Sequence, residues 1–419
     1  MSSASPTVDA SPLAAHRRER NPWSSLDRTV VDSPAHRSLA RRAALQSYVL
    51  LHNTPAPSGL PLPASLPAPL LLLGSAANDT VVLRGNYNGI PSHIVSMLEG
   101  LARRAPSGVR YYNGTDPATA TAAARGASAV IAVVRSEPES ESKDRQNVTV
   151  RQSDAGLLRA LCALPAVRTI VVLVNGGAVD VSEWMDDVRC ANPVAAIVET
   201  WLGGEEAGSA LAALLFGDDN FAALSPVTIY RQEFTAVADV ADASLRAPVG
   251  RGYRFADPRH VLFPFGHGLS YTQWSAVSVG TFDPPVVSAA WLAAQPAGSS
   301  PIRLRIALTN TGGRSGSRPL LLFLRRADGA TPDAAGGSVG GGLAWPRKWL
   351  VAFSKAHDVE SGATALLNLS VGAEAVSRWV APDSEWTSPG RLVAMPGKYV
   401  AELSDGGAGR ASCFLTVTA

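Results

Sequence analysis

A run of alternating carboxylates is the part of the sequence best suited to chemistry. It follows the apolar stretch 129–134 and consists of Glu137, Glu139, Glu141, Asp144 and Arg145. A carboxyl group can act as a general acid or a general base when its surroundings tune its pKa. Because such a run is also typical of a solvated surface loop, the residue types alone leave both interpretations open.

A second polar segment, formed by Asn86, Tyr87 and Asn88, is flanked by glycine on both sides. Amide groups and an aromatic ring are suited to the hydroxyls and faces of a sugar. The alternative interpretation is a turn that only reverses the chain. A third polar segment, 175–177, follows an apolar run, and its glycines favour a close turn toward the next element.

Metal and cofactor chemistry finds no support in the sequence. The seven histidines lack metal-ligand spacing, and no nucleophile elbow or phosphate-binding loop occurs. We therefore expect neither a metal nor a cofactor. Cys162, Cys190 and Cys413 are too few for a disulfide scaffold and allow at most one bridge. The sequence does not decide whether Cys162 and Cys190 pair.

The composition indicates a globular protein of two or three domains. The chain has 419 residues, of which 46% are apolar and 17% charged, so material for a packed core is ample. Its net charge of +2 argues against an electrostatic nucleic-acid binder. The longest apolar stretch, 60–73, is interrupted by prolines, so we expect no membrane helix.

From about residue 70 to 230, strand-like and helical runs alternate. Alternation of this kind predicts βαβ units and a mostly parallel sheet of about six strands between helices, an αβα sandwich. Ligands of such sheets bind beyond the carboxyl ends of the strands, which is where the acidic run lies. The expected strands are 70–73, 109–112, 129–134, 169–174, 195–199 and 226–230, and the expected helices are 92–105, 153–163 and 205–216.

The pattern changes after about residue 301. Apolar residues at 302, 304, 306 and 308 alternate with polar ones, which is typical of a half-buried strand. Short apolar runs follow with no helical run between them, at 320–324, 350–353, 366–371, 399–403 and 414–417. This part of the chain is therefore predicted to be all-β, an antiparallel β-sandwich.

Several phrases of the sequence, taken together and in order, resemble one family. They are GSAAND at 74–79, GNYNGIPS at 85–92, VNGGAVDVS at 174–182, WLGGEEAG at 201–208, LFGD at 215–218, GYRF at 252–255 and FPFGHGLSYT at 263–272. From about Trp23 to its end, the chain is similar to the C-terminal half of a glycoside hydrolase family 3 enzyme, in particular its β-xylosidase-like branch. The resemblance implies four parts: an N-terminal arm and linker (1–69), an α/β sandwich domain (70–232), a connecting segment (233–300) and a fibronectin type III-like domain (301–419).

The resemblance also assigns roles in the chemistry. Members carry an acid/base motif, Glu-x-Glu-Gly-x-Asp-Arg, on a loop after a sheet strand. In this sequence the motif is matched by Glu139, Glu141, Asp144 and Arg145, with Ser142 in place of the glycine. The spacing to the Asp-Arg pair favours Glu141 as the catalytic acid/base and leaves Glu139 as the second candidate. Asn86, Tyr87 and Asn88 are the substrate-binding candidates.

The partner carboxylate belongs to another domain of the family. Members have an N-terminal (β/α)8 barrel that supplies a nucleophilic aspartate, and such a barrel takes roughly 250 residues. Only about 70 residues precede the first expected strand here. We therefore expect this sequence to lack the barrel, as a fragment, a truncated gene model or a degenerate form. On its own the chain is expected to be inactive.

The resemblance implies a retaining glycoside hydrolase acting on xylan-type oligosaccharides or polysaccharides. A β-glucosidase or α-L-arabinofuranosidase specificity stays open, because the barrel holds most of the sugar pocket. A catalytically inactive carbohydrate- or partner-binding module is the alternative from another class. Four Asn-x-Ser/Thr sequons favour the secretory pathway or the extracellular space, although 1–13 does not have the pattern of a signal peptide. The sequons start at Asn78, Asn113, Asn147 and Asn368.

Overall fold

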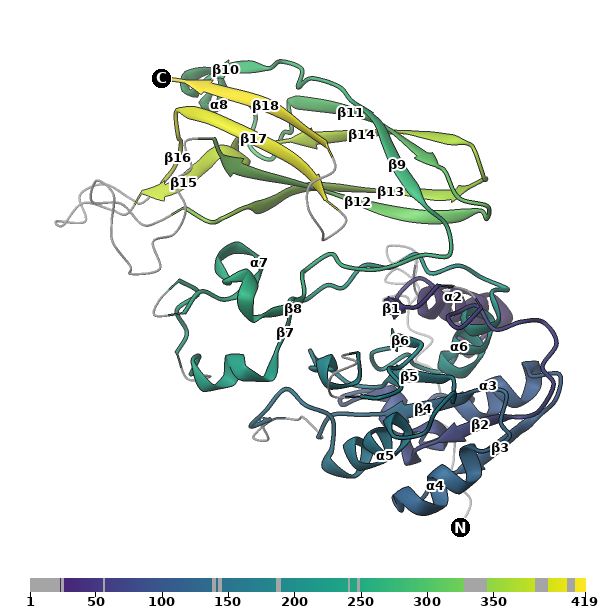
Figure 1. Cartoon of the computed structure of the whole chain (residues 1–419). Coiled ribbons are helices and arrows are strands. Elements are labelled where there is room, and N and C mark those ends of the chain that lie inside the picture. Colours follow the sequence, from purple (N-terminus) through teal and green to yellow (C-terminus); the bar gives the residue numbers. More distant parts are fainter. Residues whose placement is uncertain are drawn as a thin grey trace, which may run out of the picture.

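The computed structural model places two folded parts one above the other, joined by a segment that runs between them (Figure 1). The lower part is mixed α/β and the upper part is built of β-sheets. The structure describes residues 23, 26–55, 57–137, 141, 145–185, 190–239, 242–246, 249–327, 345–380, 391–404 and 411–419.

The α/β part is built on a six-stranded sheet with the order β1-β6-β5-β4-β2-β3. All pairs are parallel except β1 with β6. The strands β2, β4, β5 and β6 are buried along their whole length, as their apolar sequences predict. The six strands are β1 (Val49–Asn53), β2 (Leu70–Leu73), β3 (Val109–Tyr112), β4 (Val130–Val134), β5 (Thr169–Leu173) and β6 (Ala196–Glu199).

The predicted number of strands is confirmed, but one member of the sheet differs. The predicted strand 226–230 shortens to β7 (Ile229–Tyr230), which pairs with β8 (Val261–Phe263) in a separate sheet. Its place is taken by β1, from the segment expected to be an arm. Residues 48–51 are buried on both faces of the sheet, so β1 belongs to the core.

Helices cover both faces of this sheet (Figure 1). One face packs against α2 (Pro34–Leu45), α3 (Met97–Arg104) and α6 (Ala207–Phe216), and the other against α4 (Pro117–Ala124) and α5 (Gln152–Cys162). Serine and aspartate side chains cap three of these helices, at Ser33, Ser96 and Asp116. Among the described helices, none is long and apolar enough to cross a membrane.

Glycine allows α3 and α6 to approach closely. A Cβ atom on Gly100 would lie 2.1 Å from the carbonyl oxygen of Gly208, so any larger residue would push the helices apart. A disulfide between Cys162 and Cys190 ties the end of α5 to the segment that leads into β6. Cys413 is a free, half-buried thiol.

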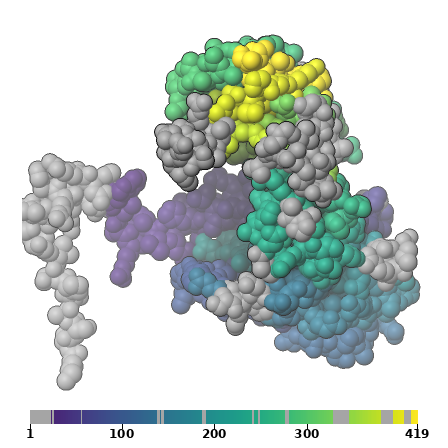
Figure 2. All heavy atoms as spheres, turned by 90° about the vertical axis from the view of Figure 1, so that its left-hand side faces the viewer, coloured from purple at the N-terminus to yellow at the C-terminus, as the bar shows by residue number. Residues whose placement is uncertain are grey.

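The segment after β7 lies between the two parts, and both views show it there (Figures 1 and 2). It includes β8 and a short helix, α7 (Gly252–Phe255). Tyr253 packs against Phe265 and Phe323, and its hydroxyl accepts a hydrogen bond from the Leu350 amide at 3.2 Å. The segment therefore joins the β part to the α/β part through packing as well as through the chain.

The upper part contains a five-stranded sheet, β10-β18-β17-β12-β13, and a three-stranded sheet, β14-β11-β9. The predicted strand at 302–309 is confirmed as β11. The β part begins before residue 301, because β9 and β10 lie in the segment expected to be a connection. Parallel pairing of β10 with β18 means that the sheets are not wholly antiparallel. The strands are β9 (Trp274–Val279), β10 (Val286–Ser288), β11 (Ile302–Asn310), β12 (Gly316–Arg326), β13 (Trp349–Val359), β14 (Thr364–Val371), β15 (Ser377–Val380), β16 (Arg391–Ala394), β17 (Gly397–Ser404) and β18 (Ala411–Thr418), and a short helix α8 (Ala289–Ala293) follows β10.

Candidate active-site edge

A cavity of about 240 Å³ opens beyond the carboxyl ends of β2, β4, β5 and β6, and we call it the strand-end cavity. This is the position at which parallel α/β sheets bind ligands. It is lined by residues that follow those strands, among them Asp79, Asn86, Arg135, Asn175, Gly176 and Leu202.

The predicted acidic loop leaves β4 beside this cavity, and both of its ends are held in place. Ser136 forms a β-bridge with Val150, and the Arg151 amide donates to the Arg135 carbonyl at 2.9 Å. At the far end of the loop, the Arg145 guanidinium donates to the Ala178 carbonyl at 3.0 Å.

Part of the loop can be compared with prediction. Glu137 and Glu141 are exposed, which confirms the predicted exposure at these two positions. Glu139, Ser142 and Asp144 lie outside the described residues. Which of Glu139 and Glu141 is the acid/base therefore stays a prediction.

The structure brings two of the predicted site residues together. The Tyr87 hydroxyl donates a hydrogen bond to the Glu141 carboxylate, and this bond raises the pKa of Tyr87. The Tyr87 ring is 83% exposed, on a backbone with a φ of +55°. Such a conformation is uncommon for an aromatic residue.

The other two predicted sugar-binding residues divide between the two interpretations. Asn86 lines the strand-end cavity. The side chain of Asn88 instead donates to the carbonyl of Gly85 at 2.9 Å, which stabilises the turn itself. The turn interpretation therefore describes Asn88, whereas Asn86 and Tyr87 stay at the candidate site.

A carboxyl group that the sequence analysis missed lies at the end of β6. Glu199 is fully buried. Its Oε1 accepts from the Trp201 amide at 2.8 Å, and its Oε2 accepts from the side-chain nitrogen of Asn175 at 3.1 Å. Burial raises the pKa of Glu199 to about 8, although these donors and the nearby Arg145 charge favour its ionised form. The sequence feature that could have revealed it is a glutamate at the end of an otherwise apolar strand.

Arg135 brings a positive charge to the cavity, but that charge is paired. Its guanidinium lies 3.2 Å from Asp79 Oδ2, and its backbone amide donates to Asp154 Oδ2 at 3.0 Å. Asp154 is buried, and burial raises its pKa. Because Asp154 lies in the first turn of α5, this contact fixes the exit of the acidic loop relative to that helix.

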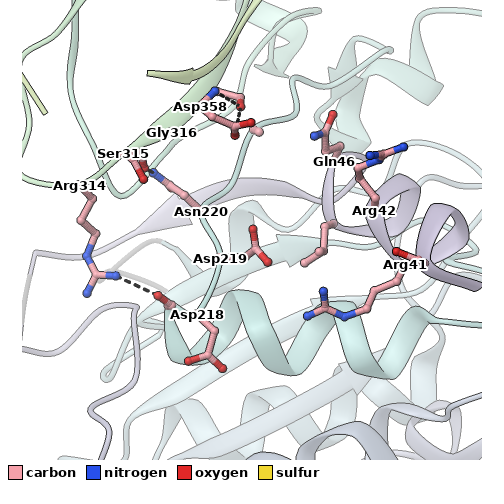
Figure 3. Close-up of a pocket in the computed structure, with 15 residues that line it drawn as sticks. Arg41, Arg42, Gln46, Asp218, Asp219, Asn220, Arg314, Ser315, Gly316 and Asp358 are labelled. Carbon is pink, nitrogen blue, oxygen red and sulfur yellow. Dashed lines mark hydrogen bonds between the residues drawn. The ribbon is translucent and has the colours of Figure 1, made fainter. Parts of the chain in front are cut away.

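A larger cavity, of about 540 Å³, lies between α2, the end of α6 and the β part (Figure 3). We call it the interdomain cavity. Polar contacts connect the two parts around it: Arg314 donates to the Gly217 carbonyl and Asn220 to the Ser315 carbonyl, both at 3.0 Å. It contains none of the predicted site residues. No group of three potential metal ligands occurs among the residues that the structure describes.

Comparison with known proteins identifies the family. The model of the glycosyl hydrolase family 3 C-terminal domain matches residues 48–271, a span that includes β1. A probable exo-1,4-β-xylosidase, bxlB, of Aspergillus clavatus is 31% identical over 93% of this chain and 49% of its own length. A β-xylosidase/α-L-arabinofuranosidase 1 of Medicago sativa subsp. varia is 31% identical over 66% of this chain and 36% of its own length.

Solved structures agree with this result. A glycoside hydrolase family 3 exo-β-xylosidase (XlnD), in complex with a xylobiose aziridine probe, superposes with a TM-score of 0.76 at 25% identity, over 92% of this chain and 49% of that one. The β-glucosidase of Bifidobacterium adolescentis, at 23% identity and a TM-score of 0.72, shows the same fold over 97% of this chain and 56% of its own. The chain spans about half the length of the curated relatives it matches. It belongs to glycoside hydrolase family 3, and residues 48–271 are its copy of that family's C-terminal domain.

Proposed function

We propose that this chain supplies the acid/base carboxyl of a retaining, β-xylosidase-like glycoside hydrolase, and that Glu141 is that carboxyl. The observation that carries the proposal is the Tyr87–Glu141 hydrogen bond beside the strand-end cavity. A carboxylate that accepts a hydrogen bond from a neighbouring ring hydroxyl is oriented, which an isolated surface glutamate is not. The position of the acidic loop, after β4 at the carboxyl edge of the sheet, also supports it.

The chemistry requires a second carboxylate. In a retaining mechanism, Glu141 would protonate the glycosidic oxygen while a nucleophilic carboxylate attacks the anomeric carbon. Glu141 would then act as a base and deprotonate the water that releases the sugar. We propose that the nucleophile and most of the sugar pocket come from a family barrel domain that closes over the strand-end edge.

We propose xylo-oligosaccharides as substrates, cleaved at a terminal xylose, because two relatives, 31% and 30% identical to this chain, are named as probable exo-1,4-β-xylosidases. The name of the Medicago relative also supports α-L-arabinofuranosidase activity as a second candidate. A secretory location is proposed as well, since disulfides persist in oxidising compartments and the sequon asparagines Asn78, Asn113 and Asn368 are exposed. We also propose that residues 301–419 belong to a fibronectin type III-like domain, which the structure extends toward the N-terminus by β9 and β10.

The test joins this chain to the barrel domain of the Aspergillus clavatus relative and measures hydrolysis of aryl β-xylosides and xylobiose. The isolated chain should show no turnover, because acid and nucleophile act as a unit. In the joined form, Glu141→Gln should lower kcat by about a hundredfold or more. The loss should be larger on xylobiose than on a dinitrophenyl xyloside, whose leaving group needs no protonation.

Glu139→Gln is the matched control, since it makes the same change two residues away. If Glu139→Gln abolished activity and Glu141→Gln did not, the assignment within the pair would be reversed. If the isolated chain hydrolysed either substrate and lost this ability in both variants, the proposal of a site completed by a barrel would be wrong. Equal losses of kcat/KM on both leaving groups would exclude an acid role for Glu141, because kcat/KM reports the step in which the leaving group departs.

A further inference from the structure

We propose that Asp32 and Arg37, in the N-terminal arm, are positioning residues for the candidate site. They hold the hydroxyl of Ser92, and through it the segment 85–92 that carries Tyr87. We call these contacts the arm clamp. The consequence for catalysis rests on the proposed function, whereas the clamp itself rests on contacts within this chain.

The first observation is an ion pair that also binds the segment. The Asp32 carboxylate accepts two hydrogen bonds from the Arg37 guanidinium, at 2.6 Å from Nε and 2.7 Å from Nη2. The Ser92 hydroxyl donates to the same carboxylate, and Arg37 Nη2 donates to the Ser92 oxygen at 3.4 Å. Only 18% of the Asp32 side chain is exposed. Because a two-point pair between guanidinium and carboxylate has a defined geometry, Ser92 meets an oriented acceptor.

The second observation is the position of Ser92 at the end of an exposed stretch. Before this stretch, the Gly85 amide bonds within a helical turn, and after it the Val95 amide donates to the Glu205 carbonyl at 2.8 Å. Residues 86–90 between these points are exposed. A stretch without buried contacts opens easily, so the contact made by Ser92 limits how far it moves.

The segment is built to pass this restraint on to Tyr87. Pro91 has a fixed φ and directly precedes Ser92. The Asn88 side chain donates to the Gly85 carbonyl at 2.9 Å, which braces the turn. Tyr87 has a φ of +55°, and a residue with a side chain keeps such a conformation where its surroundings hold it. Its hydroxyl therefore reaches the acidic loop while the segment keeps this path.

The clamp is supported by the folded core. Asp32 precedes α2 and Arg37 lies in it, and the buried end of α2, at Ala44 and Leu45, packs into the sheet core beside α6 (Figure 1). The charge of Glu206, at the start of α6, also attracts Arg37. The arm thus brings a fixed part of the core to a segment 60 residues later in the sequence.

The experiment labels the tyrosines of the full chain with ¹³C at the ring carbon that carries the hydroxyl, whose NMR signal reports hydrogen bonding of the phenol. Tyr87→Phe identifies the signal of Tyr87. Ser92→Ala removes the clamp contact at an exposed residue, so the variant should fold. In this variant the Tyr87 signal should move at least half of the way to that of free tyrosine, and the raised pKa of Tyr87 should fall toward its ordinary value.

Further variants test each member of the clamp. Ser92→Thr keeps the hydroxyl and should leave the Tyr87 signal unchanged. Ser75→Ala is the matched control, because Ser75 is exposed at the same edge of the sheet and takes no part in the clamp. Asp32→Ala should move the signal as Ser92→Ala does, and the double variant should move it no further, since both break one contact. Arg37→Gln, which leaves the carboxylate in place, should move it less.

Activity in the form joined to a barrel separates positioning from stability. Ser92→Ala should lower kcat/KM by about threefold, because Glu141 loses part of the hydrogen bond from Tyr87. In a Tyr87→Phe background the same substitution should have no effect on kcat/KM. A substitution that acted by destabilising the fold would lower kcat/KM in both backgrounds.

A Tyr87 signal that stays in place in both Ser92→Ala and Asp32→Ala would overturn the proposal. So would a Ser92→Thr variant that behaves like Ser92→Ala, because the hydroxyl would then not be the contact. The NMR result needs neither a barrel nor turnover. If Glu141 is not the acid/base, the Tyr87 signal should still follow the clamp variants, whereas kcat/KM should not.

Discussion

The two ends of the six-stranded sheet are stabilised in different ways. At the amino ends, the Cys162–Cys190 disulfide, the hydroxyl of Ser128 and the amide of Asn192 tie neighbouring segments together. At the carboxyl ends, Glu199 is buried with a raised pKa, and the Asn175 oxygen has no partner among the described residues. The amino ends are thus held by a disulfide and hydrogen bonds, whereas the carboxyl ends carry buried polar groups that are incompletely paired among the described residues.

The two cavities also differ in size and in the contacts that surround them. The interdomain cavity is more than twice the size of the strand-end cavity, with about 540 Å³ against about 240 Å³. Contacts across it join the two parts of the chain, for example Lys355 Nζ to Gln46 Oε1 at 3.0 Å. The residues that line the strand-end cavity instead follow four adjacent strands, and the polar ones follow β2, β4 and β5. We therefore favour the strand-end cavity as the candidate site, although it is the smaller of the two, because its lining residues follow adjacent strands of one sheet.

The largest effect is expected from Glu199→Gln. The pKa of Glu199 is raised from 4.5 to about 8 on folding, so the native state holds a proton that the unfolded chain releases above pH 4.5. The free energy of unfolding of the wild type should fall by about 1.4 kcal/mol per pH unit inside this window. The Gln variant has no such titration. The free energy of unfolding of the wild type relative to the variant should therefore fall by about 4 kcal/mol between pH 4 and pH 9.

Urea unfolding of both proteins from pH 4 to pH 9 measures this effect. The matched control is Glu183→Gln, which removes a half-buried carboxylate paired with Arg159 at 2.6 Å. Its effect should be small and should not grow with pH in that window. A Glu199 variant whose difference from the wild type is the same at every pH would contradict the buried, raised-pKa state of this carboxyl.

The sequence predicts much of the α/β part because its signals are local. Buried parallel strands read as continuous apolar runs. The helix predicted at 92–105 begins later than expected, at Met97, after Ser96 as its N-cap. The segment at 48–51 was equally apolar, but its membership in the sheet depends on pairing with β6, about 150 residues away. Long-range pairing leaves no local pattern, so β1 and the loss of 226–230 from the sheet were missed.

The candidate site shows the same difference between local sequence signals and long-range contacts. The position of the acidic loop and of Asn86 at the carboxyl edge could be predicted, because each follows a strand of the parallel sheet. The contact between Tyr87 and Glu141 could not, since it depends on how two loops from β2 and β4 fold over one edge. Glu199 was missed for another reason: its raised pKa arises from burial, which residue type does not reveal.

A second prediction concerns the amino ends of the sheet. Replacing Cys162 and Cys190 together with serine should lower the free energy of unfolding by about 3.6 kcal/mol, from the loss of a loop constraint of 28 residues. Thermal and urea unfolding measure this change. In the form joined to a barrel, kcat/KM at 10 °C should be unaffected, because the disulfide is at the opposite end of the sheet. A lower kcat/KM in the folded variant would show that the two ends are coupled.

A third, smaller effect is expected from Ser128→Ala. The Ser128 hydroxyl donates to the Ala68 carbonyl at 2.6 Å and accepts from the Ala68 amide at 2.9 Å, which joins the entries to β2 and β4. Losing both bonds should lower the free energy of unfolding by about 2 kcal/mol. Ser107→Ala, which removes one bond to Leu66 at 2.6 Å, should cost about half as much. Equal costs for the two variants would contradict the double role of Ser128.

The smallest effect is expected from Tyr87→Phe, at the carboxyl ends. Tyr87 is exposed, so the variant should unfold within about 0.5 kcal/mol of the wild type. In the form joined to a barrel, kcat/KM should nevertheless fall about fivefold, because Glu141 loses the donor that orients it. Tyr112→Phe is the matched control, since its hydroxyl bonds Asp116 at the end of β3 instead. A kcat/KM that falls equally in both variants, or in neither, would remove Tyr87 from the site and leave it as part of a turn.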